Sequence, residues 1–532
     1  MSDPPALPGQ RHPTVVHMLL ATAGRAPDAL ALSVHEDGGR VLALDYAGYW
    51  SAVAALARRL AAAGAGPGER VAVLLPNGAD ICIATYGILA AGAQCMPLNP
   101  GYTAHELQGI LADGAPHLLL VAPERLAELA PLAAALGIGH VWPVAAGALA
   151  APAGEAVLPG PLPTAGSPAM LQFTGGTTGR PKGVELSHAA TAVNVAQREA
   201  MLPTASDGER ILCAMPLFHA YALAMGLHLA AGCGGHLAIL PRYHPEAVLD
   251  LVAREAITLF PGAPTMFLGL MAHPRFADTD WSSVRLCYSG AAPLPAPVLQ
   301  AWEAAVGAPV LEGFGQTEAG PVISYNPPGR AKPGSVGLPL AGTRVEIVDA
   351  QTGAGPLPQG QAGEIRVRGP QVMSGYRNRP EETAEALRDG WLLTGDIGRF
   401  DADGYLFITD RKKDMAVVGG YNVYPREIDE ALAAHPEVAE AAAVAAPDAY
   451  RGEVVRAFVV PRAGAAPSVA ALLEHCRARL TRYKLPASID LVTELPRTTV
   501  GKTDKLNLKR LAAERYPAGP ASPAGQEAHD RS

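Results

Sequence analysis

The segment Thr174-Gly-Gly-Thr-Thr-Gly-Arg-Pro-Lys-Gly183 is the most informative stretch of this chain. It follows Ala169–Phe173, an apolar run that predicts a β-strand. The glycines let the backbone approach an anion closely, and the threonine, arginine and lysine side chains add donors and positive charge. A Walker loop would end in Gly-Lys-Ser/Thr, whereas here a proline precedes the lysine and a glycine follows it. The segment therefore predicts a phosphate-binding loop of another kind.

Composition excludes several other classes of protein. The chain has 532 residues, of which 49% are hydrophobic and 17% are charged, so a disordered chain is excluded. At about 150 residues per domain, this length predicts roughly three or four structural units. The net charge of −8 gives no electrostatic reason to bind nucleic acid or an anionic membrane surface.

The cysteines and the apolar runs predict a cytoplasmic protein. Six cysteines stand far apart without a CxxC pair, which indicates reduced thiols rather than disulfides or a zinc site. The N-terminus lacks a basic region followed by an apolar run, so we expect no signal peptide. The longest uncharged stretch is Ile211–Leu240. Its proline, histidines and glycines favour a buried core segment over a membrane span, which leaves at most peripheral membrane contact.

The first third of the chain alternates between predicted strands and helices. Strands are expected at Arg70–Leu75, Gln94–Leu98 and His117–Val121. Helices are expected between them, at Ala79–Leu89 and Ala104–Ala112. This alternation predicts the α/β class, with a large N-terminal body of layered, mostly parallel sheets covered by helices.

The last two hundred residues differ in pattern from the first part. Residues 334–409 are rich in Gly and Val with period-two stretches, which predict a small antiparallel or barrel part. A proline at 425 opens one predicted helix and Ser468 caps another, with strands at Val438–Val444 and Ala457–Val460 between them. These elements predict a small α+β C-terminal domain. The expected domains are residues 1–410, residues 411–518 and a disordered tail over 519–532.

Four further motifs accompany the phosphate loop, in order along the chain. They are Pro216-Leu-Phe-His-Ala-Tyr221, Gly313-Phe-Gly-Gln-Thr-Glu318, Gly390-Trp-Leu-Leu-Thr-Gly-Asp396 with Asp410-Arg411, and Pro496-Arg-Thr-Thr-Val-Gly-Lys502. Together, over roughly residues 15–515, they resemble the acyl-adenylate-forming superfamily, and most of all its medium- and long-chain fatty acyl-CoA synthetases. The resemblance implies a two-step reaction. A carboxylic acid reacts with ATP and Mg²⁺ to give acyl-AMP and pyrophosphate, and the acyl group then passes to coenzyme A.

Adenylation brings two anions together, so cations and donors are needed where the charge concentrates. By resemblance, Lys502 bridges carboxylate and α-phosphate oxygens, Thr317 donates to the α-phosphate, and Glu318 helps to hold Mg²⁺. By the same resemblance, the Asp396 carboxylate accepts hydrogen bonds from the ribose hydroxyls and the Arg411 guanidinium donates to them. The residues that the resemblance assigns to ATP are Thr174, Gly175, Gly176, Thr177, Thr178, Gly179, Lys182, Gly290, Ala291, Ala292, Glu312, Gly313, Phe314, Gly315, Asp396 and Arg411.

The resemblance also implies an acyl pocket and a second half-reaction. The predicted pocket contains His219, Tyr221 and Gly315. Lys413 is the expected hinge, about which a mobile C-terminal domain would rotate after adenylation. The rotation would bring the coenzyme A segment Gly419, Gly420 and Tyr421 to the site. One departure from the family is Phe314, where a tyrosine is usual; stacking on adenine survives this change.

Several functions stay open on the sequence alone. The leading prediction is a fatty acyl-CoA ligase. The alternatives are an aryl-acid ligase of the hydroxycinnamate or benzoate type, an acyl-AMP ligase that loads a carrier protein, and a nucleotide-binding regulator without turnover. The presence of Lys502, Glu318 and Asp396 argues against the regulator. The expected partners are the acid, ATP and coenzyme A, and a homodimer is left open.

Overall fold

The computed structural model describes residues 12–36, 39–151, 156–174, 181–205, 208–418, 421–448, 451–498 and 502–516. Internal contacts divide the chain into two units. One contains Met1–Glu346, Arg366–Thr394 and Asp403–Leu406, and the other contains Ile347–Ile365, Gly395–Ala402 and Phe407–Ser532. The predicted boundary at residue 410 stays a prediction, and the predicted tail lies outside the described residues.

A seven-stranded sheet in the first unit carries the predicted phosphate loop. Its order is β18-β8-β7-β4-β3-β5-β6, parallel from β7 to β6 and antiparallel at β8 and β18. The three strands predicted in the first third are confirmed as β3, β4 and β5. The strands are β3 (Arg70–Leu74), β4 (Gln94–Pro97), β5 (Leu118–Val121), β6 (His140–Pro143), β7 (Pro168–Thr174), β8 (Lys182–Ser187) and β18 (Gly375–Tyr376).

A nine-stranded sheet forms the rest of the first unit's framework. Its order is β15-β14-β13-β12-β11-β9-β10-β1-β2, and the strands from β13 to β1 are parallel. The strands are β1 (Leu30–His35), β2 (Val41–Asp45), β9 (Arg210–Cys213), β10 (His236–Ile239), β11 (Leu259–Gly262), β12 (Leu286–Ser289), β13 (Val310–Gly315), β14 (Val322–Tyr325) and β15 (Leu338–Pro339). Two largely parallel sheets with helices confirm the predicted α/β class.

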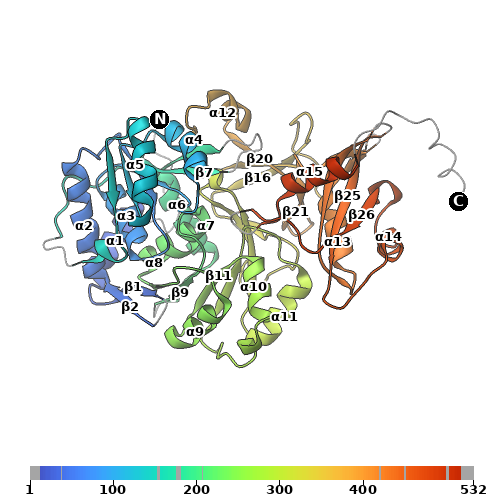
Figure 1. Cartoon of the computed structure of the whole chain (residues 1–532), viewed down its shortest axis with the longest axis horizontal. Coiled ribbons are helices and arrows are strands. Elements are labelled where there is room, and N and C mark those ends of the chain that lie inside the picture. Colours follow the sequence, from blue (N-terminus) through green and yellow to red (C-terminus); the bar gives the residue numbers. More distant parts are fainter. Residues whose placement is uncertain are drawn as a thin grey trace, which may run out of the picture. The chain divides into compact units, whose positions relative to one another are not determined.

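Figure 1 shows the helices of this unit. Local sequence signals account for several of them. All twelve residues of α3 (Ala79–Ala90) are buried, as its apolar circumference requires. Thr103 and Glu106 form a capping box that starts α4 (Ala104–Gly114). The remaining helices are α1 (Val15–Arg25), α2 (Tyr46–Ala62), α5 (Leu126–Ala135), α6 (His188–Met201), α9 (Pro245–Glu255), α10 (Pro264–Met271), α11 (Ala296–Val306) and α12 (Pro380–Ala386).

The uncharged stretch Ile211–Leu240 forms the buried segment that we predicted. Between β9 and β10 it forms three consecutive helical pieces: α7 (Ala220–Ala222), η3 (Leu223–His228) and α8 (Leu229–Cys233). The middle piece η3 is a π-helix, a form that occurs mostly as single turns within α-helices, often at functional sites. Among the described residues, no helix has both the length and the apolar character needed to cross a membrane.

A smaller five-stranded sheet follows in the chain. Its order is β16-β17-β20-β19, with β21 also paired to β20. Its strands are β16 (Arg344–Val348), β17 (Gly363–Arg368), β19 (Leu387–Arg388), β20 (Trp391–Phe400) and β21 (Leu406–Arg411). The last two strands bring in the predicted ribose-binding residues, Asp396 on β20 and Arg411 at the end of β21.

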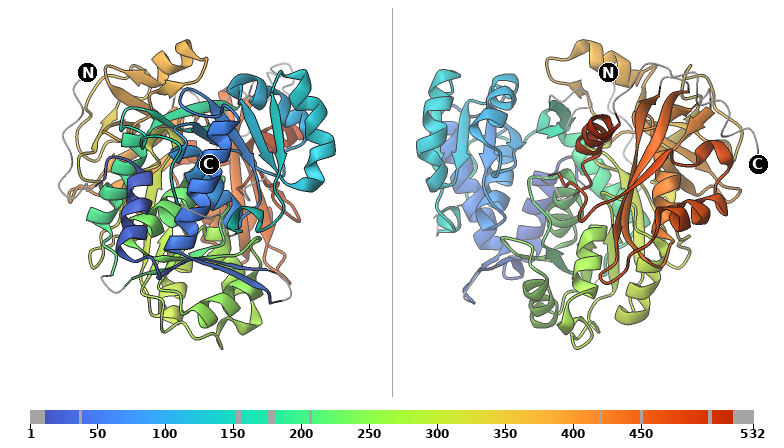
Figure 2. Two further views of the ribbon diagram at one scale, coloured as in Figure 1. Left: turned by 90° about the vertical axis from the view of Figure 1, so that its left-hand side faces the viewer. Right: turned by 45° about the vertical axis from the view of Figure 1, so that its right-hand side comes forward.

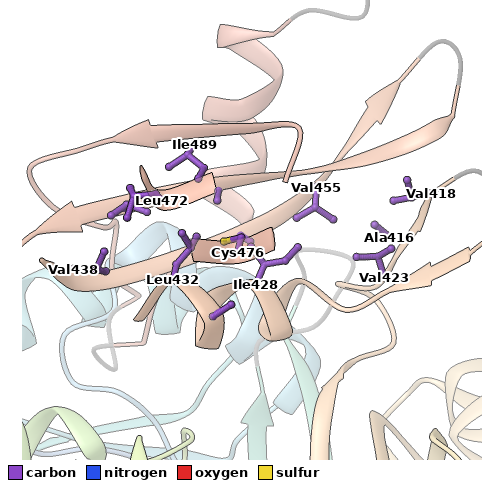
Figure 3. Packing of buried hydrophobic residues seen from close by; sticks show 14 residues of the cluster. Ala416, Val418, Val423, Ile428, Leu432, Val438, Val455, Leu472, Cys476 and Ile489 are labelled. Carbon is purple, nitrogen blue, oxygen red and sulfur yellow. The ribbon is translucent and has the colours of Figure 1, made fainter. Parts of the chain in front are cut away.

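The C-terminal block is built around a sheet in the order β23-β22-β25-β24, with β26 beside β25. One face packs on α13 and α14 through an apolar cluster that includes Ile428, Leu432 and Leu472 (Figure 3). The other face packs on α15 through Phe458 and Leu508, and the right-hand view of Figure 2 shows these strands and helices. The elements are β22 (Ala416–Val418), β23 (Tyr421–Val423), α13 (Pro425–Ala433), β24 (Val438–Asp448), β25 (Gly452–Pro461), α14 (Val469–Arg477), β26 (Ser488–Leu491) and α15 (Lys505–Arg515).

Candidate active site

The predicted phosphate loop joins two antiparallel strands. Thr174 at the end of β7 pairs with Lys182 at the start of β8, so the two ends of the loop are held side by side. Gly175, Gly176, Thr177, Thr178 and Gly179 lie outside the described residues. The structure therefore fixes where the loop begins and ends, and the loop's role stays a prediction.

Lys182 and Glu318 are linked by Tyr376, a residue that no sequence motif predicted. The Lys182 ammonium lies 5.0 Å from the centre of the Tyr376 ring, and the Tyr376 hydroxyl donates to Glu318 Oε1 at 2.9 Å. Burial, together with the charge of Glu318, raises the pKa of Tyr376, so the hydroxyl stays protonated and able to donate. Tyr376 belongs to β18, which pairs with β8. No local motif marks it, because its partners come from two distant segments.

The predicted adenine segment forms β13 and the short helix η5 (Thr317–Ala319). Its glycines are required by close packing. A Cβ on Gly315 would lie 2.0 Å from the carbonyl oxygen of Pro321, and one on Gly313 would lie 2.5 Å from the Tyr325 ring. Phe314 lies between them on the same strand. These contacts give a packing reason for glycine at both positions, separate from any approach to ATP.

The segment Gly290, Ala291 and Ala292 follows β12 and is tied to β13. The Glu312 carboxylate accepts from the backbone N–H of Leu294 at 3.2 Å. Ala291 has φ of +70°, a left-handed conformation that favours glycine. The structure thus brings together Gly290–Ala292 and Glu312, which the sequence placed in one site but could not connect.

His219 and Tyr221 begin the helix that runs on into η3. The Tyr221 N–H donates to His219 Nδ1 at 3.3 Å, which caps the first turn. The Tyr221 ring covers Gly290, where a Cβ would lie 2.8 Å from it. Its hydroxyl is 3.3 Å from that of Tyr325. Burial raises the pKa of both tyrosines, so both hydroxyls keep their protons.

A second buried polar group lies beside these tyrosines. Arg198 of α6 is 1% exposed and donates to the Tyr288 hydroxyl, and it also pairs with Glu199 at 2.8 Å. The Tyr288 ring contacts the Tyr325 ring edge to face, with the two centres 6.0 Å apart. Arg198 was not predicted as a site residue, because a charged residue within a helix is ordinarily expected at the surface.

A cavity of about 10 Å³ lies among the predicted motif segments of the first unit. Its wall includes Gln172 of β7, two residues before Thr174, and Ala220, which lies between His219 and Tyr221. The cavity is otherwise mainly apolar. Its lining residues are Met170, Gln172, Leu186, Thr191, Val195, Ala220, Leu223, Ala224, His228, Gly320 and Pro321.

The second unit brings Lys502 together with Asp396 and Arg411, two residues on the paired strands β20 and β21. Arg411 Nε lies 3.4 Å from Asp396 Oδ1. Burial and the Arg411 charge lower the pKa of Lys502 to about 8, while the Asp396 charge opposes that shift. Lys502 therefore lies within electrostatic range of both residues. Its N–H donates to Thr498 Oγ1 at 3.2 Å, and its carbonyl accepts from the N–H of Thr498 at 2.7 Å.

The predicted hinge lies in the same unit as Lys502. The Lys509 ammonium of α15 donates to the carbonyl of Lys413 at 3.2 Å and to Asp414 Oδ1 at 3.1 Å. Burial lowers the pKa of Lys413. Tyr421 begins β23, whereas Gly419 and Gly420 lie outside the described residues. The hinge and coenzyme A assignments stay predictions.

The magnesium assignment depends on Glu318. Among residues that the structure describes, no three His, Cys, Asp or Glu side chains gather as a metal site. Mg²⁺ needs few protein ligands, because it keeps waters and phosphate oxygens in its coordination shell. A single half-buried carboxylate, held by the Tyr376 hydroxyl, therefore fits a magnesium ion that ATP brings with it.

Comparisons with known proteins agree with these features. A family model described as AMP-binding enzyme matches residues 19–377, and one described as AMP-binding enzyme C-terminal domain matches residues 427–502. A long-chain-fatty-acid–CoA ligase of Bacillus subtilis is 36% identical, covering 92% of this chain and 93% of its own length. A feruloyl-CoA synthase of Amycolatopsis is 40% identical, covering 88% and 94%.

Solved structures of CoA ligases and related enzymes also resemble this chain over nearly its whole length. ATP-bound MatB from Rhodopseudomonas palustris superposes with a TM-score of 0.87 at 32% identity, over 94% of this chain and 99% of that one. An anthranilate CoA ligase in complex with anthranoyl-AMP gives 0.86 at 27% identity, over 95% and 98%.

Proposed function

The chain belongs to the AMP-binding enzyme family. On this premise we propose that it activates a medium- or long-chain fatty acid as acyl-AMP, releases pyrophosphate and transfers the acyl group to coenzyme A. It is an enzyme of the AMP-forming CoA ligase class. Its co-substrates are ATP and coenzyme A, and its metal ion is Mg²⁺. The observation that carries the proposal is the grouping of Lys502 with Asp396 and Arg411, which lie on the paired strands β20 and β21.

The chemistry of this grouping suits adenylation. A carboxylate must approach an α-phosphate, so a cation is needed where their oxygens converge. Lys502 supplies that charge below its pKa of about 8. The Asp396 carboxylate accepts hydrogen bonds from the ribose hydroxyls, and the Arg411 guanidinium donates to them. Because Lys502 is half-buried, its attraction for the two anions is stronger than at a fully exposed site.

The first unit supplies the remaining groups in this proposal. The loop between Thr174 and Lys182 surrounds the phosphates, and Thr317 donates to the α-phosphate. Glu318 holds the magnesium ion, which offsets phosphate charge when bound. Gly290–Ala292 and Gly313–Gly315 line the adenine site. The acid occupies the space beside His219, Tyr221 and Gly315.

The hinge proposal concerns the second half-reaction. Rotation about Lys413 withdraws Lys502 after adenylation and brings the segment at Gly419, Gly420 and Tyr421 to the acyl-AMP. Coenzyme A then displaces AMP.

Six free cysteines suit a reducing compartment, and we therefore place the reaction in the cytoplasm. The sequence leaves open whether the chain forms a homodimer. A measurement of its molar mass in solution would decide this.

One observation favours a second candidate, an aryl-acid CoA ligase. Tyr221 and Tyr325 carry two buried hydroxyls 3.3 Å apart. One donates to the other, so one hydroxyl hydrogen remains for a further acceptor. A ring hydroxyl or methoxy oxygen on an aryl acid would supply that acceptor, whereas an unsubstituted chain would not.

A panel of acids separates these candidates. Acetate, octanoate, palmitate and 4-coumarate are each incubated with ATP and Mg²⁺, with and without coenzyme A, while pyrophosphate and thioester are measured. The proposal expects octanoate or palmitate to give the largest kcat/KM and a thioester only with coenzyme A. A clear preference for 4-coumarate would establish the aryl ligase instead. Pyrophosphate release without thioester formation would indicate a different acceptor, such as a carrier-protein thiol.

A further inference from the structure

The side-chain amide of Asn194 holds a strand of the other large sheet. Asn194 lies on α6 and is 1% exposed. Its Nδ2 donates to the carbonyl oxygen of Val322 at 2.9 Å, and its Oδ1 accepts from the N–H of the same residue at 3.0 Å. The amide thus pairs with both backbone polar groups of one residue of β14, as a residue of a neighbouring antiparallel strand would. The proposed function does not use Asn194.

Val322 ends the turn that carries two of the groups proposed to act on ATP. The turn begins at Gly315, which pairs with Val322 across β13 and β14. Within it, the N–H of Gln316 donates to the carbonyl of Pro321 at 2.9 Å. The proposed α-phosphate donor and magnesium ligand lie on η5, inside this closed turn. Because the turn is short and held at its base, a shift of Val322 would move both groups.

The helix that carries Asn194 follows directly on the far side of the phosphate loop. β8 begins at Lys182 and ends at Ser187, and Ser187 caps α6 by accepting from the N–H of Ala190 at 3.1 Å. Asn194 is in the second turn of this helix. Its contact with Val322 therefore ties the turn around η5 to the element that leaves the phosphate loop.

Neighbouring groups fix the orientation of the Asn194 amide. Its Nδ2 also donates to Gln197 Oε1 at 3.1 Å, and Gln197 Nε2 donates to the carbonyl of Ala341 at 2.8 Å. The reversed amide would place Oδ1 against two oxygens, the Val322 carbonyl and Gln197 Oε1. Such a mismatch is costly at a buried position, where water cannot relieve it. The amide therefore holds Val322 in one register.

We propose that Asn194 is a positioning residue for adenylation, whose amide holds Thr317 and Glu318 at a fixed place relative to the phosphate loop. The proposal rests on the proposed function, because it needs these two residues to act on the α-phosphate and the magnesium ion. Its effect passes through the backbone of Val322. Transfer of the acyl group from acyl-AMP to coenzyme A releases no pyrophosphate, so this second step should depend on the turn much less.

Asn194→Leu tests the proposal, because it removes both hydrogen bonds to Val322 at similar side-chain size. The substrate is the acid of the panel that the full-length protein adenylates fastest. We expect kcat/KM for ATP in adenylation to fall by about tenfold to a hundredfold, since a misplacement of about 1 Å can cost that much. The Mg²⁺ concentration for half-maximal rate should rise. Conversion of synthetic acyl-AMP with coenzyme A should stay within a few-fold of the parent.

Asp80→Leu is the matched control. Asp80 is 8% exposed on α3, and its carboxylate accepts from the N–H groups of Gly147 and Leu149 at 2.6 and 2.8 Å. It therefore also holds two backbone groups of a distant segment, but away from the predicted motifs. This variant should lower the melting temperature and leave the Mg²⁺ dependence and the ratio of the two rates unchanged. Asn194→Ser, whose side chain is too short to span both groups of Val322, decides the matter if Asn194→Leu does not fold.

The outcomes separate this inference from the proposed function. Adenylation at the parental rate in the Asn194 variants would overturn the role of Asn194 and leave the ligase function intact. Equal losses in both half-reactions, or the same change in Mg²⁺ dependence in Asp80→Leu, would also overturn it, because either would indicate general damage to the fold. Failure of the unaltered protein to adenylate any acid would overturn the proposed function, and this inference with it.

Discussion

Lys502 combines charge with burial, and this gives a prediction about pH. Its pKa of about 8 means that it is protonated below that pH and loses its charge as pH rises through it. If the charge promotes adenylation, kcat/KM for ATP should be constant below pH 8 and fall above it. Lys502→Arg keeps a cation at all these pH values. We expect this variant to be slower but to lack the alkaline fall. The same alkaline fall in both proteins would exclude Lys502 as its cause.

Tyr376 gives a second prediction, on the magnesium side. Tyr376→Phe keeps the ring beneath Lys182 but removes the donor to Glu318. We expect kcat/KM for adenylation to fall by roughly three- to thirtyfold and the Mg²⁺ concentration for half-maximal rate to rise, with little change in melting temperature. Tyr405→Phe is the matched control, since Tyr405 also lies beneath a lysine and donates to a carbonyl. Equal effects of the two substitutions would contradict the assignment.

The residues differ in how far the sequence could predict them. Lys502, Glu318 and Asp396 stand in motifs, so their types and spacing were sufficient to propose them. Tyr376 and Asn194 are defined only by what they touch, and their partners lie 58 and 128 residues away in the chain. Local patterns carry no information on such contacts, and the structure was needed to find them.

Secondary structure was predicted well where local chemistry determines it. Ser468 caps α14 by accepting from the N–H of Ala471, and Pro425 occupies the first turn of α13, both as predicted. Val469, the first residue of α14, is apolar but 38% exposed. It precedes Leu472 and Cys476, the buried residues of this helix. The π-helical turn η3 was not predicted, because five of its six residues are Leu, Ala, Met or Gly, and tertiary packing decides how such a segment winds.

The glycines of β13 give a prediction about stability. Gly315→Ala would put a Cβ 2.0 Å from a backbone oxygen, which cannot move without shifting the chain at Pro321. We expect the free energy of unfolding to fall by about 2 kcal/mol or more, and adenylation to decline with it. Gly24→Ala is the control: it lies in α1, and its Cβ would meet nothing within 4 Å. This change should be neutral or slightly stabilising. Chemical denaturation of both variants measures the difference, and a neutral Gly315→Ala would refute the packing argument.

The predicted fold class was confirmed because it follows from periodicity along the whole chain. A chain that alternates strands and helices forms parallel sheets with helices packed on their faces, whatever the individual residues are. The domain boundary expected at residue 410 stays a prediction. The second unit includes Ile347–Ile365 and Gly395–Ala402, which come from the region assigned by sequence to the large domain. Such a discontinuous arrangement depends on strand pairing between distant segments, and a linear pattern does not reveal it.

The hinge proposal predicts that the two half-reactions can be separated. Lys413→Pro fixes φ near about −65°, which limits the rotation that a hinge must allow. Thioester formation from acyl-AMP should slow at least tenfold more than adenylation does. Lys413→Ala, which keeps backbone freedom, should leave the ratio of the two rates unchanged. Equal losses in both steps for the proline variant would indicate general damage to the fold, and no loss would place the hinge elsewhere.

The central claim is that this chain makes a thioester through acyl-AMP with Lys502 acting in the first step only. The most direct measurement compares Lys502→Ala with the parent in two assays: acyl-AMP formation from acid and ATP, and conversion of synthetic acyl-AMP with coenzyme A. We predict that the first rate falls by about 10²-fold or more while the second stays within a few-fold of the parent. Lys332→Ala, which removes a lysine paired with Asp403, should change neither rate. Adenylation at the parental rate in Lys502→Ala would contradict the account.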